Sequence, residues 1–241
     1  MTLAGKTVLV TGGARRIGRA IAMAVAEAGA DVILHHHASV QEAAETAEDI
    51  LNLGRKAWVV QADLEDPSQV TAMIDRASKF ASIDALVNNA AIFGSQDVLS
   101  TTLENWHQHL AVNLTAPFLL SQEFARRYSA APEGRILNIL DWRAVRPGAD
   151  HFAYTISKAA LAAMTQSLAV ALAPRILVNG LALGAILPPA EGPNPDKILQ
   201  SVPAARWADL REVAESVVFL LSGPAYMTGE ILHLDGGRHL V

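Results

Sequence analysis

Tyr154 and Lys158 are four residues apart and could act together in proton transfer. The run AYTISKAAL around them predicts the start of a helix, and this spacing puts both side chains on one helical face. A tyrosine hydroxyl ordinarily has a pKa of about 10, which is too high for an efficient acid at neutral pH. A neighbouring ammonium favours the phenolate, so we expect Lys158 to lower the pKa of Tyr154.

Asp141 is the third candidate for this chemistry. It ends the apolar run NIL upstream of the tyrosine, where a strand is predicted to end. A tyrosine and a lysine at this spacing are common on solvated helix faces. Only the carboxylate before them makes the pair a candidate site. The simpler alternative is that Asp141 caps a loop and is solvated.

Residues 11–18 read TGGARRIG and follow a predicted strand directly, before a predicted helix. Glycines let the backbone approach a ligand closely, and the amide groups at a helix N-terminus attract anions. A tight turn between strand and helix is the alternative, but this context favours a dinucleotide pyrophosphate site. The candidate residues of the loop are Gly12, Arg15, Arg16, Ile17 and Gly18.

The second predicted strand ends in His35-His36-His37-Ala38-Ser39, without the acid that binds the ribose 2′-hydroxyl in NAD-binding domains. A carboxylate there would repel a 2′-phosphate, so its absence favours NADPH. Arg15, Arg16, His37 and Ser39 could donate hydrogen bonds to that phosphate. Successive residues of a strand face opposite ways, so the three histidines cannot bind one metal ion, and we expect no metal site.

Short apolar runs alternate with helical patterns along the chain. The predicted strands are Lys6–Val10, Asp31–His35, Lys56–Gln61, Ala85–Asn88, Arg135–Leu140, Arg175–Val178 and Glu230–Leu234. The first two helices are predicted at Arg16–Ala28, before Gly29, and from a Ser39 cap to about Leu53, before Gly54. Continuous apolar strands alternating with helices indicate a Rossmann-type α/β fold, a doubly wound sheet of about seven parallel strands. We expect one domain spanning residues 1–241.

Composition narrows the class of protein. Hydrophobic residues make up 51% and charged residues 18%, which is typical of a globular domain. The absence of cysteine excludes disulfides and cysteine nucleophiles and fits a reducing compartment. The formal charge of −5 disfavours nucleic acid and anionic membranes as partners. No secretory signal or continuous apolar span is evident, so we expect a cytoplasmic protein. The stretch Leu187–Asp196 (LPPAEGPNPD) predicts an irregular loop beyond a strand end, where substrate loops occur.

The order of these motifs resembles the short-chain dehydrogenase/reductase family over essentially the whole chain. The glycine loop, Asn88-Asn89-Ala90, Asn113, Tyr154 with Lys158, and Asp235-Gly236-Gly237 carry the resemblance. It implies hydride transfer from a nicotinamide, with Tyr154 as proton donor and Lys158 on the nicotinamide ribose. It also implies that Asn113 supports the proton relay, that Asp63 and Leu64 contact adenine, and that Asn89 and Ala90 contact the adjoining ribose. A homotetramer follows by analogy alone, with the helix that starts near Tyr154 in one interface.

Three positions depart from the usual pattern of that family. Arg16 replaces the middle glycine of the loop, Asp141 replaces the catalytic serine, and Leu183-Gly184 replaces a Pro-Gly pair beside the nicotinamide. The first two departures resemble pteridine reductases, including the dihydromonapterin reductase branch. That resemblance implies Phe93 as a ring that stacks on the pterin, with Arg16, Asp141 and Tyr154 around the substrate. Ala38 stands where those enzymes keep a phosphate-binding arginine.

Three functions are open at this point. The first is NADPH-dependent reduction of a dihydropterin, a small-molecule substrate. The second is a carbonyl reductase acting on a 3-oxoacyl thioester or small ketone, which the missing serine disfavours. The third is a catalytically silent NADP-binding protein, which the intact Tyr154 and Lys158 pair disfavours. Phe93 has an alternative as a core aromatic residue, and the three histidines have one as a polar strand end.

Overall fold

One parallel sheet organises the protein. The computed structural model describes residues 2–128, 134–188 and 195–241. Within these residues the sheet has seven strands in the order β3-β2-β1-β4-β5-β6-β7, and all pairings are parallel. The strands are β1 (Thr7–Val10), β2 (Asp31–His36), β3 (Ala57–Gln61), β4 (Ala85–Asn88), β5 (Gly134–Asp141), β6 (Ile176–Leu183) and β7 (Ile231–Leu234). The predicted doubly wound fold is confirmed.

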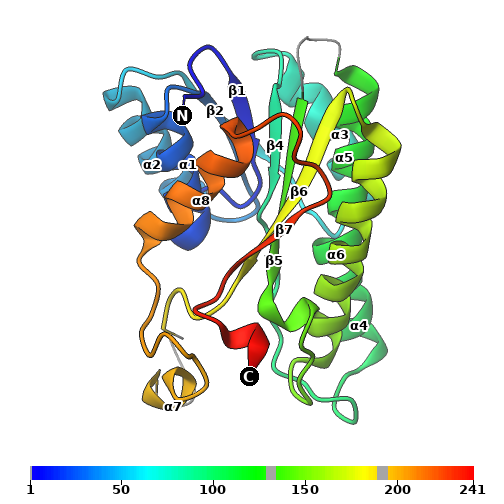
Figure 1. Ribbon diagram of the computed structural model, residues 1–241. Coiled ribbons are helices and arrows are strands. Elements are labelled where there is room, and N and C mark those ends of the chain that lie inside the picture. Colours follow the sequence, from blue (N-terminus) through cyan, green and yellow to red (C-terminus); the bar gives the residue numbers. More distant parts are fainter. Residues whose placement is uncertain (1, 129–133, 189–194) are drawn as a thin grey trace.

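Helices cover both faces of the sheet, as Figure 1 shows with β7 toward the viewer. One layer holds α1 (Arg16–Glu27), α2 (Val40–Asn52) and α8 (Leu210–Ser222). The other holds α3 (Pro67–Ser78), α5 (Ala116–Arg127) and α6 (Phe152–Leu172), with α4 (Leu103–Leu110) packed on α6. The short elements are η1 (Ala111–Thr115), η2 (Trp142–Ala144), α7 (Pro195–Leu199) and η3 (Arg238–Leu240).

Two apolar clusters between these layers form the core. On the side of α1 and α8 the strands contribute Val8, Val10, Val32 and Leu34, and on the opposite side Leu9 and Ile33. Neighbouring residues of β1 and β2 are therefore buried on both faces. This burial explains why these strands are continuous apolar runs in the sequence.

The structure differs from the predicted elements at several ends. The sixth strand runs to Leu183, beyond the predicted end at Val178, because it pairs with β5 as far as Asp141 and with β7 as far as Leu234. Ser39 holds the N-cap position of α2, but its side chain makes no capping hydrogen bond. The predicted loop Leu187–Asp196 ends in helix α7, which begins at Pro195, a residue type suited to the first helical turn. Positions 189–194 of that loop lie outside the described residues.

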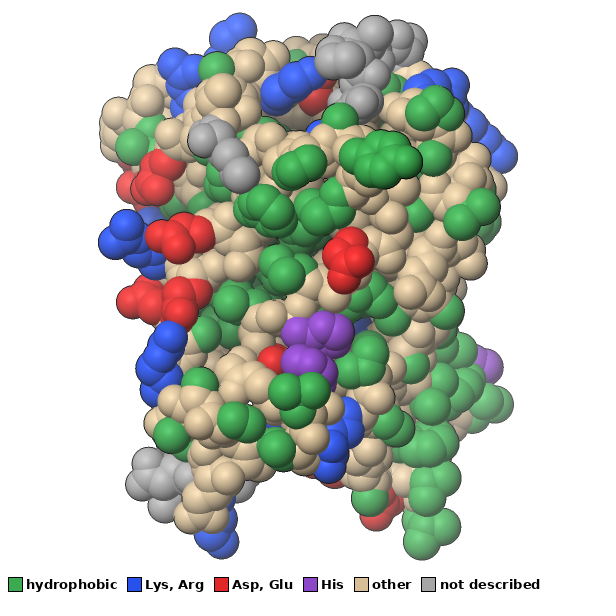
Figure 2. Space-filling view, viewed as in Figure 1, with side chains coloured by type: hydrophobic (Ala, Val, Ile, Leu, Met, Phe, Trp, Pro, Cys, Tyr) green, Lys and Arg blue, Asp and Glu red, His purple; other side chains and the backbone are tan. Residues whose placement is uncertain are grey.

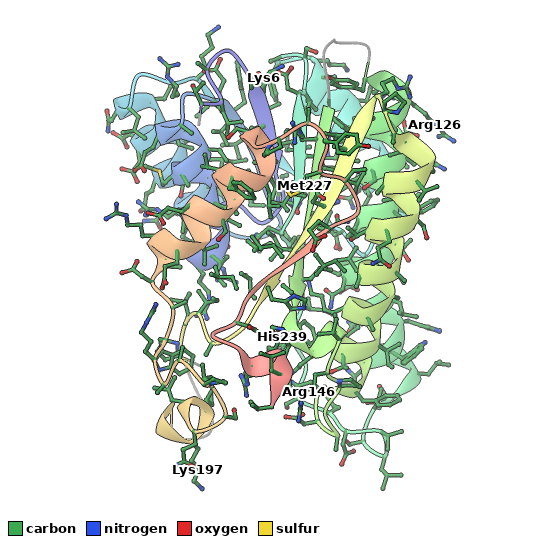
Figure 3. The ribbon with its side chains drawn as sticks, viewed as in Figure 1. Lys6, Arg126, Arg146, Lys197, Met227 and His239 are labelled. Atoms are coloured by element: carbon green, nitrogen blue, oxygen red, sulfur yellow. The ribbon has the colours of Figure 1, made fainter. Side chains whose placement is uncertain are left out.

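The strand order reverses between β1 and β4, because β2 continues the sheet on one side and β4 on the other. Ligands of open α/β sheets bind at the carboxyl ends of the strands beside such a switch point. Figure 3 shows His239, Arg146 and Lys197 at that end of the molecule and Lys6 and Arg126 at the opposite end. The carboxyl ends of β1, β4 and β5 are therefore where a site is expected.

By length and composition, α6 could cross a membrane, and it is the one such helix among the described residues. It packs on β5 and β6 in this fold, and it buries the polar side chains of Ser157 and Lys158. Core helices of folded α/β domains pass the same test, so the apolar composition of α6 is explained by its place beside the sheet.

Candidate active site

The loop between β1 and α1 contains residues in the left-handed backbone conformation. Gly12 and Arg16 both have positive φ angles, 61° and 52°. A side chain at Gly18 would overlap the carbonyl oxygen of Gly12, so the loop can pack on α1 only with glycine there. Because its φ is positive, Arg16 adopts a left-handed backbone conformation that favours glycine, and this conformation costs about 1 kcal/mol of stability.

Thr11 connects this loop to the end of β4. Its hydroxyl oxygen accepts the backbone N–H groups of Asn89 at 2.9 Å and Ala90 at 3.0 Å. The Asn89 amide in turn donates to the Thr11 carbonyl at 2.8 Å. These bonds hold the two predicted ribose-contacting residues against the glycine loop.

His35 is a structural residue of the loop. Its buried ring accepts the Gly12 N–H at Nδ1, at 3.1 Å, and donates from Nε2 to the Ala62 carbonyl, also at 3.1 Å. Burial lowers the pKa of His35 to about 4, so the ring is neutral at neutral pH. A neutral ring with Nε2 protonated is the form that can make both bonds.

The outer part of a long cleft runs along these residues and has a volume of about 520 Å³. The predicted cofactor residues at this end all line it: Gly12, Arg15, Arg16, Ile17, Gly18, His37, Ser39, Asp63, Leu64, Asn89 and Ala90. The exposed His37 ring lies 3.9 Å from the Asp63 carboxylate. His37, which is predicted to contact the 2′-phosphate, and Asp63, which is predicted to contact adenine, therefore lie side by side.

The inner part of the cleft, about 260 Å³, shares Arg16, Ile17, Asn89 and Phe93 with the outer part. Its other predicted residues come from distant segments and meet here: Asp141, Tyr154, Lys158 and Gly184. Because the two parts share a wall, an extended molecule in the outer part reaches the three candidate catalytic side chains.

The Tyr154 hydroxyl donates a hydrogen bond to Oδ2 of Asp141 at 3.0 Å. The other carboxylate oxygen, Oδ1, accepts the backbone N–H of Arg143 at 2.9 Å, where η2 begins. The ammonium of Lys158 is buried and donates to the Ile139 carbonyl at 2.7 Å. All three groups of the sequence-based hypothesis therefore line one chamber. Asp141 does cap the turn η2, as the alternative expected, but it also accepts the Tyr154 hydroxyl and lines the cleft, so capping is not its whole role.

Burial controls the protonation of all three groups. It raises the pKa of Asp141, against the hydrogen bond from the Arg143 N–H, and it lowers the pKa of Lys158 to about 8. Burial, and then the Asp141 carboxylate, raise the pKa of Tyr154 well above its ordinary value. The predicted lowering by Lys158 was wrong, since its nitrogen lies 5.9 Å from the ring centroid and bonds to Ile139, whereas Asp141 is in direct contact.

Asn113 is fully buried in η1, a π-helical turn between α4 and α5, and it does not line the cleft. Its side chain accepts the Ile92 N–H at 2.9 Å and donates to the Ile92 carbonyl at 3.0 Å and to Ser157 at 3.0 Å. It thus connects the loop after β4 to α6. The predicted support of a proton relay by Asn113 stays a prediction.

Phe93 is an exposed wall of the cleft rather than a core aromatic residue, with 61% of its surface accessible. Its ring meets Tyr154 edge-on at 4.6 Å and stacks on His151 at 4.1 Å, with 23° between the planes. The imidazole covers part of the phenyl ring, and the rest is available to a flat ligand.

The departure at Leu183-Gly184 leaves the strand end regular. Leu183 pairs with Leu234, and the Gly184 N–H donates to the Leu234 carbonyl at 3.0 Å. A Cβ at Gly184 would lie 2.5 Å from the Asp235 Cα, so glycine permits the close approach of β7.

The C-terminal segment packs beside the turn that carries Asp141. The guanidinium of Arg238, in η3, lies 4.2 Å from the ring centroid of Trp142, the residue after Asp141. Beside it, Asp235 accepts His239 Nδ1 at 2.7 Å. Histidine side chains gather on this face in Figure 2, and Figure 3 labels His239 there. The end of the chain therefore packs against the turn that carries Asp141.

Sequence reasoning missed several of these residues. His35, His109 and His151 position the backbone or Phe93, and Thr11 joins two strand ends. The threonine directly before the glycine pair was a usable signal, whereas nothing in the sequence indicates the histidine contacts. Within residues 2–128, 134–188 and 195–241 there is no group of three or more side chains suited to hold a metal ion.

Comparison with known proteins extends the resemblance to most of the chain. A family model described as "Enoyl-(Acyl carrier protein) reductase" matches residues 12–239. The 3-oxoacyl-[acyl-carrier-protein] reductase of Aquifex aeolicus is 38% identical and covers 98% of both chains, and that of Synechocystis is 34% identical over 98% of this chain and 97% of its own. The chain belongs to the short-chain dehydrogenase/reductase family. The predicted family is thereby confirmed.

Solved structures of this family include relatives bound to NADP. FolM alternative dihydrofolate reductase 1 from Brucella canis, complexed with NADP, is 37% identical, has a TM-score of 0.92 and covers 100% of this chain and 97% of its own. A short-chain dehydrogenase from Burkholderia cenocepacia in complex with NADP is 38% identical, with a TM-score of 0.92 and 99% of each chain covered. These two NADP-bound relatives are thus similar to this chain to nearly the same degree.

Proposed function

We propose that this protein reduces a 7,8-dihydropterin to the tetrahydropterin with NADPH as the hydride source. The hydrogen bond from Tyr154 to the carboxylate of Asp141, at 3.0 Å inside the cleft, is the observation on which the proposal rests. A carboxylate at this position suits protonation of a ring nitrogen. It would repel the negative charge that develops on the oxygen of a ketone during reduction.

The outer cleft fits a phosphorylated dinucleotide. Helix α1 begins beside the glycine loop. In the described structure no side chain caps this helix and its first turn holds no acidic residue, so its backbone N–H groups are available to a pyrophosphate. Arg15, His37 and Ser39 line the same cleft and offer donors to a 2′-phosphate. The NADP complexes of similar structures agree with this choice of cofactor.

The reduction needs one hydride and one proton across a carbon–nitrogen double bond of the substrate. Bound NADPH would supply the hydride to the ring carbon. Tyr154 would donate its proton to the ring nitrogen. Asp141, whose pKa is raised, would then donate a proton to the tyrosine oxygen. Lys158 is a cation below about pH 8, and the family resemblance implies that its ammonium binds the ribose of the nicotinamide.

The pterin is a flat ring that needs a stacking partner as well as polar groups at its edge. Phe93 supplies an exposed aromatic face at the wall of the inner cleft, in edge contact with Tyr154. A ring stacked there would lie between Phe93 and the nicotinamide end of the cleft, with Arg16 and Asp141 at its rim. This arrangement would hold the reacting carbon close to the hydride donor.

Reduction of a 3-oxoacyl thioester is the second candidate, because 3-oxoacyl-[acyl-carrier-protein] reductases are 34% and 38% identical to this chain over nearly their full length. The degree of identity does not separate the two functions, since the FolM relative is 37% identical. Asp141 separates them, because in its ionised form it only accepts hydrogen bonds and repels a developing alkoxide, whereas a neutral serine hydroxyl donates a hydrogen bond to a carbonyl oxygen.

The test is an NADPH-oxidation assay on purified protein with dihydromonapterin, dihydrobiopterin, dihydrofolate, a 3-oxoacyl thioester and small ketones. We expect turnover of the dihydropterins, weaker turnover of dihydrofolate and slow reduction of the ketones. Product analysis should identify the tetrahydropterin. Ketone reduction without activity on any dihydropterin would favour the second candidate, and no NADPH oxidation with any substrate would favour a silent binding protein.

A further inference from the structure

The backbone on both sides of Phe93 is held by side chains from other elements. On one side, Asn113 accepts the Ile92 N–H at 2.9 Å and donates to the Ile92 carbonyl at 3.0 Å. On the other side, the Gly94 N–H donates to Nε2 of His109 at 3.0 Å, and the Gly94 carbonyl accepts Nδ1 of His151 at 2.7 Å. All four polar backbone groups that flank Phe93 are therefore satisfied by side chains.

His109 is a buried side chain that is oriented to accept the Gly94 N–H. It is 5% exposed and lies one helical turn before Asn113, so the two side chains point to the same loop. Its Nδ1 donates to the Asn105 carbonyl at 2.7 Å, which leaves Nε2 without a proton and able to accept the Gly94 N–H.

Gly94 is the residue that lets the imidazole approach. A Cβ there would lie 2.8 Å and 2.9 Å from Cε1 and Nε2 of the His109 ring, closer than side chains pack. Its backbone angle is not the reason for the glycine, because Gly94 is absent from the positive-φ glycines of the described chain. The close approach of the His109 ring and of Gln96 Oε1, which would lie 2.5 Å from such a Cβ, favours glycine here.

His151 holds both the backbone and the ring. Its imidazole stacks on Phe93 at 4.1 Å while Nδ1 bonds to the Gly94 carbonyl. It caps α6 in a left-handed conformation, with φ 53°, one turn before Tyr154. The position of Phe93 is thus coupled to the helix that presents the candidate proton donor.

We propose that His109 and His151 are positioning residues that fix the Phe93 ring as the stacking platform for the substrate, and so favour flat heteroaromatic substrates over keto substrates. This inference rests on the proposed function. Neither histidine needs to touch the substrate, because each acts through Gly94, and His151 also acts through its ring contact with Phe93.

Four variants separate the contacts. His109→Gln keeps an acceptor for the Gly94 N–H, and His109→Leu removes it. His151→Asn keeps a donor near the Gly94 carbonyl but loses the ring, and His151→Phe keeps a ring but loses the donor. His107→Leu is the matched control, because His107 is an exposed residue of the same helix.

We expect His109→Leu and His151→Asn to raise the KM for the dihydropterin about tenfold, the scale of one lost hydrogen bond or stacking contact. The KM for NADPH should stay close to wild type in every variant, since neither histidine lines the outer cleft. His109→Gln should recover most of the loss and His107→Leu should change nothing. An equal rise of both KM values, or no rise for His109→Leu, would overturn the proposal.

Hydrogen–deuterium exchange tests the positioning without a substrate. We expect faster exchange in the peptide that spans residues 90–97 for His109→Leu and His151→Asn, and wild-type exchange for His107→Leu. Unchanged exchange would overturn the proposal whatever the substrate is. If the exchange is faster but the wild type reduces no dihydropterin, the proposed function and the preference for flat substrates are both wrong. The positioning of the loop around Phe93 by His109 and His151 is then still supported.

Discussion

The Tyr154 hydroxyl donates a hydrogen bond of 3.0 Å to the Asp141 carboxylate, and both residues line the inner cleft. Burial raises the pKa of both groups, so the tyrosine keeps its proton and the carboxylic acid takes one up more readily than in water. A pair with these properties can hold a proton and transfer it to a bound substrate. A serine in place of Asp141 could not accept a second proton.

Removal of the tyrosine hydroxyl should abolish most turnover. In Tyr154→Phe we expect kcat to fall at least about a hundredfold, the usual contribution of a general acid. NADPH should bind with wild-type affinity, because the ring and its contact with Phe93 remain. Steady-state kinetics with a separate NADPH titration checks both parts. Near-normal turnover would show that another group donates the proton.

The affinity for NADPH should weaken as the pH rises through about 8, where Lys158 loses its charge. Burial lowers this pKa and the Asp141 carboxylate opposes the shift, so in Asp141→Asn the same loss should begin at lower pH. Lys158→Arg should show no such transition, because a guanidinium stays protonated. Binding titrations across the pH range give the midpoints. A midpoint that does not move in Asp141→Asn would contradict this account.

NADPH should be preferred to NADH by at least about tenfold in kcat/KM, which corresponds to about 1.4 kcal/mol. No carboxylate ends β2, and Arg15 and Ser39 line the cleft beside it. Arg15→Ala should lower kcat/KM for NADPH and leave that for NADH nearly unchanged, since only NADPH carries the 2′-phosphate. Equal values for the two cofactors in the wild type would refute the prediction.

Gly18→Ala should destabilise the protein by about 3 kcal/mol or more, on the scale of a severe steric clash. The added methyl group would overlap the Gly12 carbonyl and approach Asn89 Nδ2 to 2.7 Å. Gly54→Ala is the control, since a Cβ there meets no atom within 4 Å, although its φ of 73° carries a smaller cost of about 1 kcal/mol. Urea unfolding of both variants gives the comparison. Equal losses would show that the close packing at Gly18 is not the cause.

The fold was predictable because local patterns dominate it. Apolar runs mark the buried parallel strands, and Gly29 and Gly54, both with positive φ, follow the first two helices as expected. The end of β6 was not predictable, because its last residues up to Leu183 are held by pairing with strands far away in the sequence. Strand length there is a property of the assembled sheet.

The residues of the site were predictable from motif order, but their electrostatics were not. Burial raises the pKa of Tyr154, and contact with Asp141 rather than Lys158 adds to the rise, and only the folded chain determines both. The same holds for His109 and His151, whose contacts with Gly94 join segments with no common pattern. The homotetramer and the cytoplasmic location stay predictions.

The most direct measurement is the ratio of kcat/KM for a dihydropterin to kcat/KM for a 3-oxoacyl thioester, in the wild type and in Asp141→Ser. It should be made at mildly acidic pH, where Lys158 is charged in both proteins and NADPH binding is unaffected. We predict a ratio well above one in the wild type and a fall of at least about tenfold, or about 1.4 kcal/mol, in the variant. A wild-type ratio below one that Asp141→Ser leaves unchanged would contradict the assignment of this enzyme as a pterin reductase.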